Sequence, residues 1–391
     1  MTNILQLHPV LKADFVRAEG STLYDSQGRG FLDWESGVWC TGLGHGHPRI
    51  TEVLHRQAGR LMHLGFRYQS PVTEEAAAEL LDLAGLAGGR CVFLTSGSEA
   101  VNLALHLARP ATRKTRFVCL DPTFLASYGQ GADQSGTRWT HVDRDATGLD
   151  PVMDWDPVSA FVLEPGSACG SVQFPCEGLV GRIADRVQGR GGLVVVDEVV
   201  TGLGRSGEWF GFNHFDVRPD IVALGKGLGN GYPVSAVLVS QQVARALSAT
   251  DLHYIQSHQN DPLGCAVALE VVRTLRQEGL VERSRQVGRL LLDRLTDLQT
   301  RCPALKEVRG RGLMVAAELQ ERIAADRVFD RMLDRGFLIG CSPTFNLVRF
   351  MPPLNVPLQE IDRLLDALEA VLHEVAGSAQ GPRRSTWPEG S

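Results

Sequence analysis

The sequence predicts an α/β protein in which helices cover both faces of a mostly parallel β-sheet. Short apolar runs alternate with amphipathic stretches through the middle of the chain, and polar or glycine-rich segments follow several of the runs. Runs that are apolar throughout are typical of strands that are buried on both faces. The last third mixes strands and helices without this alternation, which predicts a second, smaller α+β domain.

The elements of the large sheet can be assigned in order. The expected strands cover residues 91–94, 116–120, 160–163, 193–196, 221–224 and 236–239, and the clearest helices between them cover 99–109 and 179–188. Parallel strands need long crossover connections, and helices usually supply them. This order therefore predicts parallel pairing for most of the sheet.

The pattern changes after about residue 262. A long helical pattern runs to residue 299 with a break near Gly279, and the remaining elements are strands at 312–318 and 348–350 and helices at 326–335 and 359–375. The end of the chain is rich in glycine, proline and serine, which predicts a flexible tail. We expect an N-terminal segment (1–50), a large ligand-binding domain (51–285), a small domain (286–375) and a tail (376–391).

Composition excludes several classes of function. The 391 residues carry a formal net charge of −6, so the chain offers no basic field for nucleic acid. No apolar stretch approaches the ~20 residues of a membrane span, and the polar start is unlike a signal peptide. The eight cysteines are widely spaced. They predict reduced thiols in a cytoplasmic protein and no metal site.

Lys226 is the first candidate for chemistry. It follows the apolar run 221–224 and precedes a glycine-rich segment at 227–231. An amine at the end of a buried strand is partly desolvated, which lowers its pKa and makes it a nucleophile able to form a Schiff base. The alternative is a structural lysine whose amine extends from the loop into solvent.

A possible anion site precedes the helix expected at 99–109. Gly97 and Ser98 lie in a short turn of hydroxyl residues and glycine after the strand 91–94. Free N–H groups at the start of a helix bind phosphate well. The alternative is an ordinary helix cap supplied by Ser98.

Two further residues follow predicted strands. Asp197 ends the apolar run 193–196, where a carboxylate can pair with a protonated ring nitrogen or simply cap the next loop. Phe124 follows the strand 116–120, where its ring can stack on a cofactor or belong to the core. Ligands bind at the carboxyl ends of strands in open α/β sheets. A phosphate site, a ring-nitrogen carboxylate, a stacking ring and a buried lysine together predict pyridoxal 5'-phosphate as the cofactor.

These residues lie in longer motifs, and with them the chain resembles the class III (omega-amino-acid type) pyridoxal-phosphate-dependent aminotransferases of fold type I. The resemblance covers about residues 15–372. It is densest at 193–207 and 219–233, with supporting matches at 31–34, 43–48, 93–99, 308–313 and 348–354. It implies a large cofactor domain and a small domain built from the C-terminal part together with the N-terminal segment.

The resemblance also implies roles for residues around the cofactor. Lys226 would form the Schiff base and move the substrate proton, and Asp197 would bind the pyridine nitrogen. Val199 and Phe124 would contact the two faces of the ring. Gly97 and Ser98 would hold the phosphate.

Three more residues are implied at the edges of the site. Ser257 would reach the phosphate of the neighbouring subunit, which implies a homodimer with shared active sites. Arg349 would pair with the substrate carboxylate, and Trp39 would line the substrate pocket. The reaction would transfer an amino group from an amino-acid or amine donor to a keto-acid or aldehyde acceptor in two half-reactions.

The chain departs from the family pattern at two places that affect substrates. Cys169 stands where omega-amino members carry a glutamate that masks the carboxylate-binding arginine, so we expect Arg349 to be unmasked. Residues 125–127 lack the arginine that ornithine-type members use. Both departures make ornithine and acetylornithine poorer guesses for the substrate.

Two other functions remain open from the sequence. An aminomutase or epimerase on the same fold would need Lys226 and Asp197 equally, and transfer to a separate keto acid would distinguish the aminotransferase from it. A non-catalytic binding protein would have no chemical reason to retain Lys226, Asp197 and Arg349 together. His45 and His47 lack a third metal ligand and are interpreted as parts of a structural loop.

Overall fold

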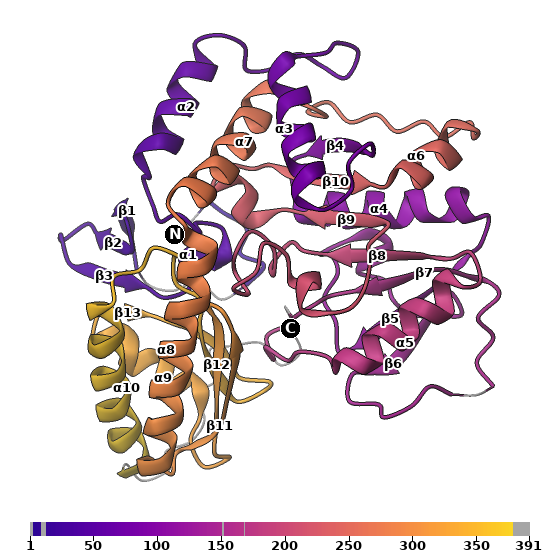
Figure 1. Ribbon diagram of the computed structural model, residues 1–391. Helices are drawn as coiled ribbons and strands as arrows, with labels where there is room; N and C mark the ends of the chain where they lie inside the picture. Colours follow the sequence, from indigo (N-terminus) through magenta and orange to yellow (C-terminus); the bar gives the residue numbers. More distant parts are fainter. Residues whose placement is uncertain (1–2, 9–12, 151, 168, 378–391) are drawn as a thin grey trace.

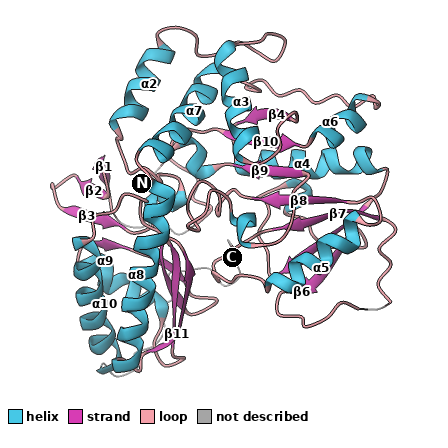
Figure 2. Cartoon of the chain, viewed as in Figure 1, coloured by secondary structure: helices cyan, strands magenta, loops and turns pink. Residues whose placement is uncertain are grey.

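The computed structural model describes residues 3–8, 13–150, 152–167 and 169–377. Figures 1 and 2 show a large sheet with its helices in one part of the molecule and two smaller sheets with α8, α9 and α10 in another. The small part includes the N-terminal strands, as the sequence resemblance implied. Within the described residues, no helix combines the length and apolar character that a membrane span needs.

The large sheet has seven strands in the order β4-β10-β9-β8-β7-β5-β6. β10 runs antiparallel to both of its neighbours, and the other pairs are parallel. β4 and β9 therefore point the same way, so six strands place their carboxyl ends at one edge. The strands are β4 (Arg90–Leu94), β5 (Arg116–Asp121), β6 (Trp139–Asp143), β7 (Val158–Leu163), β8 (Leu193–Asp197), β9 (Ile221–Leu224) and β10 (Ser235–Val239).

Helices bury both faces of this sheet. Val195 of β8 belongs to the apolar cluster of α4 (Gly97–Thr112) and α6 (Gln241–Ser248). Its neighbours Val194 and Val196 belong to the cluster of α3, α5 and α7 on the other face. Successive strand residues point to opposite faces, so a continuous apolar run requires both layers. The helices of the second layer are α3 (Pro71–Leu83), α5 (Glu177–Gln188) and α7 (Pro262–Gln277), with α2 (Pro48–Ala58) packed on α7.

The smaller part contains two four-stranded sheets. In one, β13 (Phe337–Leu338) pairs in parallel with β3 (Gly30–Asp33), so the N-terminal strands are completed from the C-terminal part. The other has the order β11-β12-β15-β14. The remaining elements are β1 (Phe15–Glu19), β2 (Thr22–Asp25), β11 (Leu305–Arg311), β12 (Met314–Leu319), β14 (Gly340–Ser342), β15 (Leu347–Phe350), α8 (Leu280–Arg301), α9 (Ala325–Asp334) and α10 (Gln359–Gly377).

The predicted break near Gly279 is confirmed, because α7 ends and α8 begins there with a left-handed Gly279 at φ 62°. In the large sheet one strand, β6, was missed. It lies at the sheet edge and its residues alternate in burial, so it lacks a continuous apolar run. Of the predicted tail, residues 376–377 end α10 and 378–391 lie outside the described residues. The domain limits at 50 and 285 stay a prediction.

Candidate active site

A pocket of about 580 Å³ lies at the carboxyl edge of the large sheet. It brings together six of the predicted residues, which lie at or shortly after the carboxyl ends of four different strands. These are Gly97, Ser98, Phe124, Asp197, Val199 and Lys226. Ser96, Leu125, Ser127, Glu164 and Val200 complete the lining.

Lys226 occupies a strained position directly after β9. It is the first residue of a 3₁₀ turn, η3 (Lys226–Gly229), with a left-handed φ of 41°. Non-glycine residues adopt such backbone only where the surrounding structure enforces it, often at functional sites. Burial lowers the pKa of the amine, and the Asp197 charge opposes part of that shift. The amine is thus closer to its neutral, nucleophilic form than a solvent-exposed lysine.

Asp197 is the last residue of β8 and is only 6% exposed. The backbone N–H of Val199 donates to its Oδ1 at 2.9 Å. Burial raises its pKa well above the ordinary value, and the nearby Glu164 raises it further. A cation next to this carboxylate would favour its ionised form, so a protonated pyridine nitrogen suits the position.

The phosphate end is formed by the start of α4. Ser96, not Ser98, caps the helix, and it forms a capping box in which Glu99 Oε2 accepts from the N–H groups of Thr95 and Ser96. Among the described residues, no recorded hydrogen bond uses the N–H of Gly97 or Ser98. Because Ser96 caps the helix, these two N–H groups remain available at the positive end of α4, where an anion binds well.

Gly97 is required because the segment directly after β8 approaches the start of α4 closely. A Cβ at this position would lie 2.7 Å from Cγ1 of Val199. Val199 itself lines the pocket beside Asp197. Gly97, the buried carboxylate and the amine together fit pyridoxal phosphate: the start of α4 would hold its phosphate, and Asp197 and Lys226 would hold its ring.

Phe124 lines the pocket from the loop after β5, and 45% of it is exposed. Glu164 fixes this loop by accepting from the Thr123 hydroxyl at 2.9 Å and from the Phe124 N–H at 3.4 Å. The ring is thus at the open side of the pocket and outside the core. A large exposed aromatic on a fixed loop is suited to cover a planar ligand.

Trp39 contacts both Lys226 and Arg349, the predicted carboxylate-binding arginine. Lys226 Nζ lies 4.8 Å from the centroid of the Trp39 ring, and the guanidinium carbon of Arg349 lies 5.1 Å from it. Both contacts are cation–π interactions. The structure therefore places Trp39 and Arg349 beside the pocket, as the sequence predicted.

The prediction that Arg349 is unmasked is wrong. Its Nη2 lies 3.6 Å from Oε2 of Glu35, and the indole N–H of Trp39 is 3.4 Å from Oε1 of the same residue. Sequence reasoning missed Glu35 because it considered only the position of Cys169. A carboxylate within the apolar segment 31–39 was the available signal.

Glu35 and Trp39 are placed by an unusual turn. The four residues of α1 (Ser36–Trp39) all have left-handed backbone, with φ between 43° and 69°. Left-handed geometry costs about 1–2 kcal/mol for each non-glycine residue, so other contacts must hold the turn. Buried Asp33 does so by accepting from the N–H of Glu35 at 2.9 Å and of Gly37 at 2.8 Å. Arg205 donates to the Ser36 hydroxyl at 3.1 Å.

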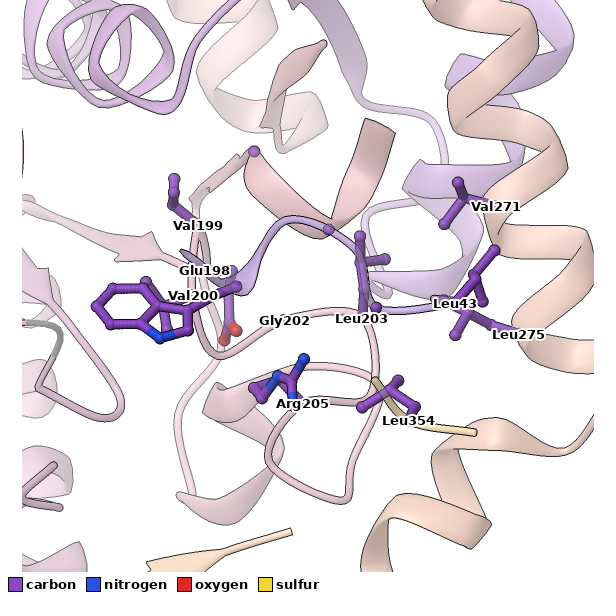
Figure 3. A pocket seen from close by; sticks show the side chains of 14 residues that line it. Leu43, Glu198, Val199, Val200, Gly202, Leu203, Arg205, Val271, Leu275 and Leu354 are labelled. Carbon is purple, nitrogen blue, oxygen red and sulfur yellow. The ribbon is translucent and has the colours of Figure 1, made fainter. Parts of the chain in front are cut away.

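A second pocket, of about 380 Å³, borders the first and shares Val199 and Val200 with it. Figure 3 shows its wall of apolar side chains from separate elements, among them Leu43, Leu275 and Leu354. Its lining is predominantly apolar apart from Glu198 and Arg205. We interpret it as an extension of the core behind the turn of Trp39.

Six of the predicted site residues line the pocket and Trp39 and Arg349 lie beside it, whereas Ser257 does neither. It is exposed in the segment between α6 and α7 and is not part of the pocket lining. Nearby, Asp261 accepts from His63 at 2.7 Å and from His258 at 2.6 Å. Within the described ranges these three form one group with possible metal-ligand atoms, and none of them lines the pocket.

A half-buried lysine and a buried aspartate at the carboxyl edge of a mostly parallel sheet form the arrangement that the resemblance to pyridoxal-phosphate-dependent enzymes of fold type I implied. The sequence profile of the family "Aminotransferase class-III" matches residues 6–127 and 133–372. The chain belongs to this family, and it is a pyridoxal-phosphate-dependent aminotransferase, as the sequence motifs predicted.

Named relatives agree with this assignment. The acetylornithine aminotransferase of Aquifex aeolicus (strain VF5) is 31% identical, over 95% of this chain and 100% of its own length. The acetylornithine aminotransferase of Methanopyrus kandleri is 32% identical, over 91% of this chain and 94% of its own. Among solved structures, the ornithine aminotransferase of Toxoplasma gondii has a TM-score of 0.85 at 26% identity and covers 96% of this chain and 93% of its own.

Proposed function

We propose that Lys226 carries the cofactor and that the enzyme transfers an amino group from an amino-acid donor to a keto-acid or aldehyde acceptor in two half-reactions. When bound, pyridoxal phosphate supplies the electron sink for negative charge at the substrate α-carbon. Lys226 attaches the cofactor through Nζ and then serves as the base that moves the α-proton. Its lowered pKa suits it to both tasks.

The other residues of the pocket would hold and orient the cofactor. Asp197 keeps the ring nitrogen protonated, because a buried carboxylate stabilises an adjacent cation. The N–H groups of Gly97 and Ser98 bind the phosphate. Val199 and Phe124, which both line the pocket, would contact the two faces of the ring. These contacts restrict the reacting groups to one geometry.

Arg349 and Trp39 bind the substrate. The guanidinium can hold a substrate carboxylate with two parallel hydrogen bonds. The Trp39 ring lies near both this guanidinium and the reacting amine of Lys226. We propose substrates with a carboxylate next to the reacting carbon. The named relatives are acetylornithine aminotransferases. In this chain Leu125 and Ser127 line the pocket where an arginine would serve ornithine-type substrates, which favours a different donor.

The observation that carries the proposal is that the half-buried Lys226 and the buried Asp197 line one pocket, where desolvation lowers the pKa of the amine and raises the pKa of the carboxyl group. The test is an absorbance spectrum of the purified protein before and after single amino donors are added. We expect a band near ~420 nm that a donor removes and a keto acid restores. Lys226→Ala should lose the band, whereas Lys306→Ala, which changes an exposed lysine, should keep it.

Each other outcome is informative. Absence of the band after reconstitution with pyridoxal phosphate would contradict the proposal. A band that forms but transfers no nitrogen to a separate keto acid would favour an aminomutase or epimerase.

We further propose a cytoplasmic homodimer that binds neither nucleic acid nor membranes. Exposed Ser257 supports shared active sites, and large apolar side chains are exposed nearby at Phe66, Tyr68 and Ile255. The eight cysteines are all free, as is usual in the cytoplasm. The net charge of −6 supports the absence of a nucleic-acid partner. The molar mass in solution, measured by light scattering, tests the dimer.

A further inference from the structure

Two histidines and an aspartate form a compact group outside the cofactor pocket. Asp261 accepts through Oδ1 from Nδ1 of His63 at 2.7 Å and through Oδ2 from Nδ1 of His258 at 2.6 Å. The centroids of the two imidazole rings are 5.0 Å apart. Each residue has a possible metal-ligand atom within 4.8 Å of those of the other two. Three side chains of metal-ligating type, from two separate segments of the chain, thus converge on one point.

Asp261 is the N-cap of α7, but its side chain does not cap the helix. An aspartate at this position usually accepts from N–H groups of the first helical turn. Within the described residues its carboxylate makes no capping hydrogen bond, and its two oxygens face the two imidazoles instead. Only 14% of the Asp261 side chain is exposed, against 52% for His63 and 60% for His258. A mostly buried carboxylate therefore lies next to two imidazoles that a dissolved ion can reach.

Backbone hydrogen bonds hold the group in place. Asn260, the residue before Asp261, is attached to β4: its N–H donates to the carbonyl oxygen of Phe93 at 3.0 Å, and its side chain accepts from the Phe93 N–H at 2.9 Å. The N–H of Leu263 donates at 3.4 Å to the carbonyl oxygen of Met62, the residue before His63. Both ligand-bearing segments are thus attached near the start of α7. A cation could bind without a large rearrangement of the backbone.

We propose that His63, His258 and Asp261 bind a divalent cation of the first transition series, and that Zn²⁺ suits them best. Imidazole and carboxylate are common zinc ligands, whereas Mg²⁺ and Ca²⁺ prefer oxygen ligands alone. Three protein ligands leave the fourth tetrahedral position to water. This inference is independent of the proposed function, because none of the three residues lines the cofactor pocket.

The cation would replace contacts that contribute little. A pair between an exposed imidazole and a carboxylate is weak in water, and both imidazoles are more than half exposed. Zn²⁺ binds imidazole nitrogen and carboxylate oxygen directly at ~2.0–2.2 Å. Small rotations of the exposed rings suffice, because their Nδ1 atoms already face the carboxylate. The start of a helix is unfavourable for a cation, and the negative charge of Asp261 opposes this effect.

A bound cation would connect two segments without regular secondary structure. His63 lies between α2 and α3, and the other two ligands lie at the end of the segment between α6 and α7. Segments of this kind open locally more easily than the helices and strands that they join. An ion that binds only the folded arrangement stabilises it. Zinc should therefore slow the local opening of residues 59–70 and 249–261.

The inference departs from the sequence-based prediction of no metal site. That prediction considered the cysteines and the adjacent pair His45 and His47. His63 and Asp261 are 198 positions apart in the sequence, so only the folded chain brings them together.

Calorimetric titration of the purified holoenzyme with Zn²⁺ tests the site. We expect the wild type to bind one ion per chain in competition with no Mg²⁺. His63→Gln, His258→Gln and Asp261→Asn should each weaken binding at least about 10–100-fold, the loss that removal of an outer-shell partner alone can cause. His55→Gln changes an exposed histidine at the end of α2 and should bind Zn²⁺ as the wild type does. The two histidine variants alter exposed side chains, so they should fold normally.

Co²⁺ gives a spectroscopic check of the geometry. In a tetrahedral site it absorbs visible light, and we expect the wild type to show this absorption and Zn²⁺ to remove it. His63→Gln should not show it. Hydrogen exchange with and without Zn²⁺ tests the connection: exchange in residues 59–70 and 249–261 should slow in the wild type and stay unchanged in His63→Gln.

Two results would overturn the proposal. If the wild type binds no Zn²⁺, or if it and the three ligand variants bind Zn²⁺ equally, the group is a hydrogen-bonded cluster and any bound zinc is adventitious. If Zn²⁺ binds at these residues but exchange in the two segments does not slow, the ion does not connect them.

Discussion

Asp197 and Glu198 show how neighbouring residues in one sequence motif acquire separate tasks. Asp197 lines the cofactor pocket, whereas Glu198 lines the second pocket on the other side of the chain. Glu198 accepts from the N–H groups of Gly211 at 2.8 Å and Phe212 at 2.7 Å and from the Thr201 hydroxyl at 2.7 Å. The first carboxylate is thus available for a ligand and the second is committed to holding a loop.

The burial of Glu198 has a consequence for stability. Burial raises its pKa from 4.5 to about 7, so the folded state retains a proton that the unfolded state loses. Its contribution to stability is fully present below pH 4.5 and is lost as the pH rises to about 7. Between these values we expect the wild type to lose about 3 kcal/mol of unfolding free energy more than Glu198→Gln does. Urea unfolding of both proteins at several pH values measures this difference.

The exposed replacement Glu208→Gln provides the control, because it should follow the pH dependence of the wild type. Parallel stability curves for the wild type and Glu198→Gln would show that Glu198 does not titrate in this range.

At the scale of elements, close backbone contact joins the two parts of the molecule. A Cβ on Gly288 of α8 would lie 2.0 Å from the carbonyl oxygen of Gly312, in the turn between β11 and β12. A Cβ on Gly312 would in turn lie 2.3 Å from the N of Gly207, in the loop that follows the cofactor strand β8. The helix, the small sheet and the site loop thus meet through backbone atoms.

We expect Gly288→Ala to destabilise the protein by about 3 kcal/mol, because the added methyl group overlaps a backbone that cannot move away easily. The matched change Gly181→Ala lies within α5, where nothing is within 4 Å of the new Cβ. It should stabilise the protein by about 0.5–1 kcal/mol, since alanine favours helix. Denaturant unfolding of both variants measures the two changes in unfolding free energy, which should have opposite signs. If Gly288→Ala left the unfolding free energy unchanged, the close contact with Gly312 would be contradicted.

Sequence reasoning succeeded where local pattern determines structure. The buried strand β9 was predicted to the residue, and the pocket contains six of the seven residues expected around the cofactor, all except Ser257. It failed where contacts between residues far apart in the sequence determine the local conformation. The left-handed turn at 36–39 contradicts local preference. It is held by Arg205 and by the N–H of Met351, which donates to the carbonyl oxygen of Trp34. The pairing of Glu35 with Arg349 followed from that turn and was therefore missed.

At the scale of the whole molecule, the proposed dimer predicts that two inactive variants can restore each other. Lys226→Ala and Ser257→Asp should each leave less than about 1% activity, the second because its charge repels the phosphate. In a hybrid dimer one site would combine Lys226 of one chain with Ser257 of the other and be intact. We expect a hybrid purified through two different tags to have about half of the wild-type activity.

The control is each variant alone, purified in the same way. If Ser257 acts within its own chain, both sites of the hybrid are damaged and the hybrid stays inactive.

The pairing of β3 with β13 also bears on how the protein is made. Asp33, which holds the turn of Trp39, pairs with Leu338, about 300 residues later in the chain. At ~5–20 residues per second the ribosome needs roughly 15–60 s to bridge that interval. The large sheet can fold during this time, while the N-terminal strands remain without their partner. Completion of the substrate end is therefore a late event in biosynthesis, and a nascent chain would acquire its cofactor pocket before its carboxylate site.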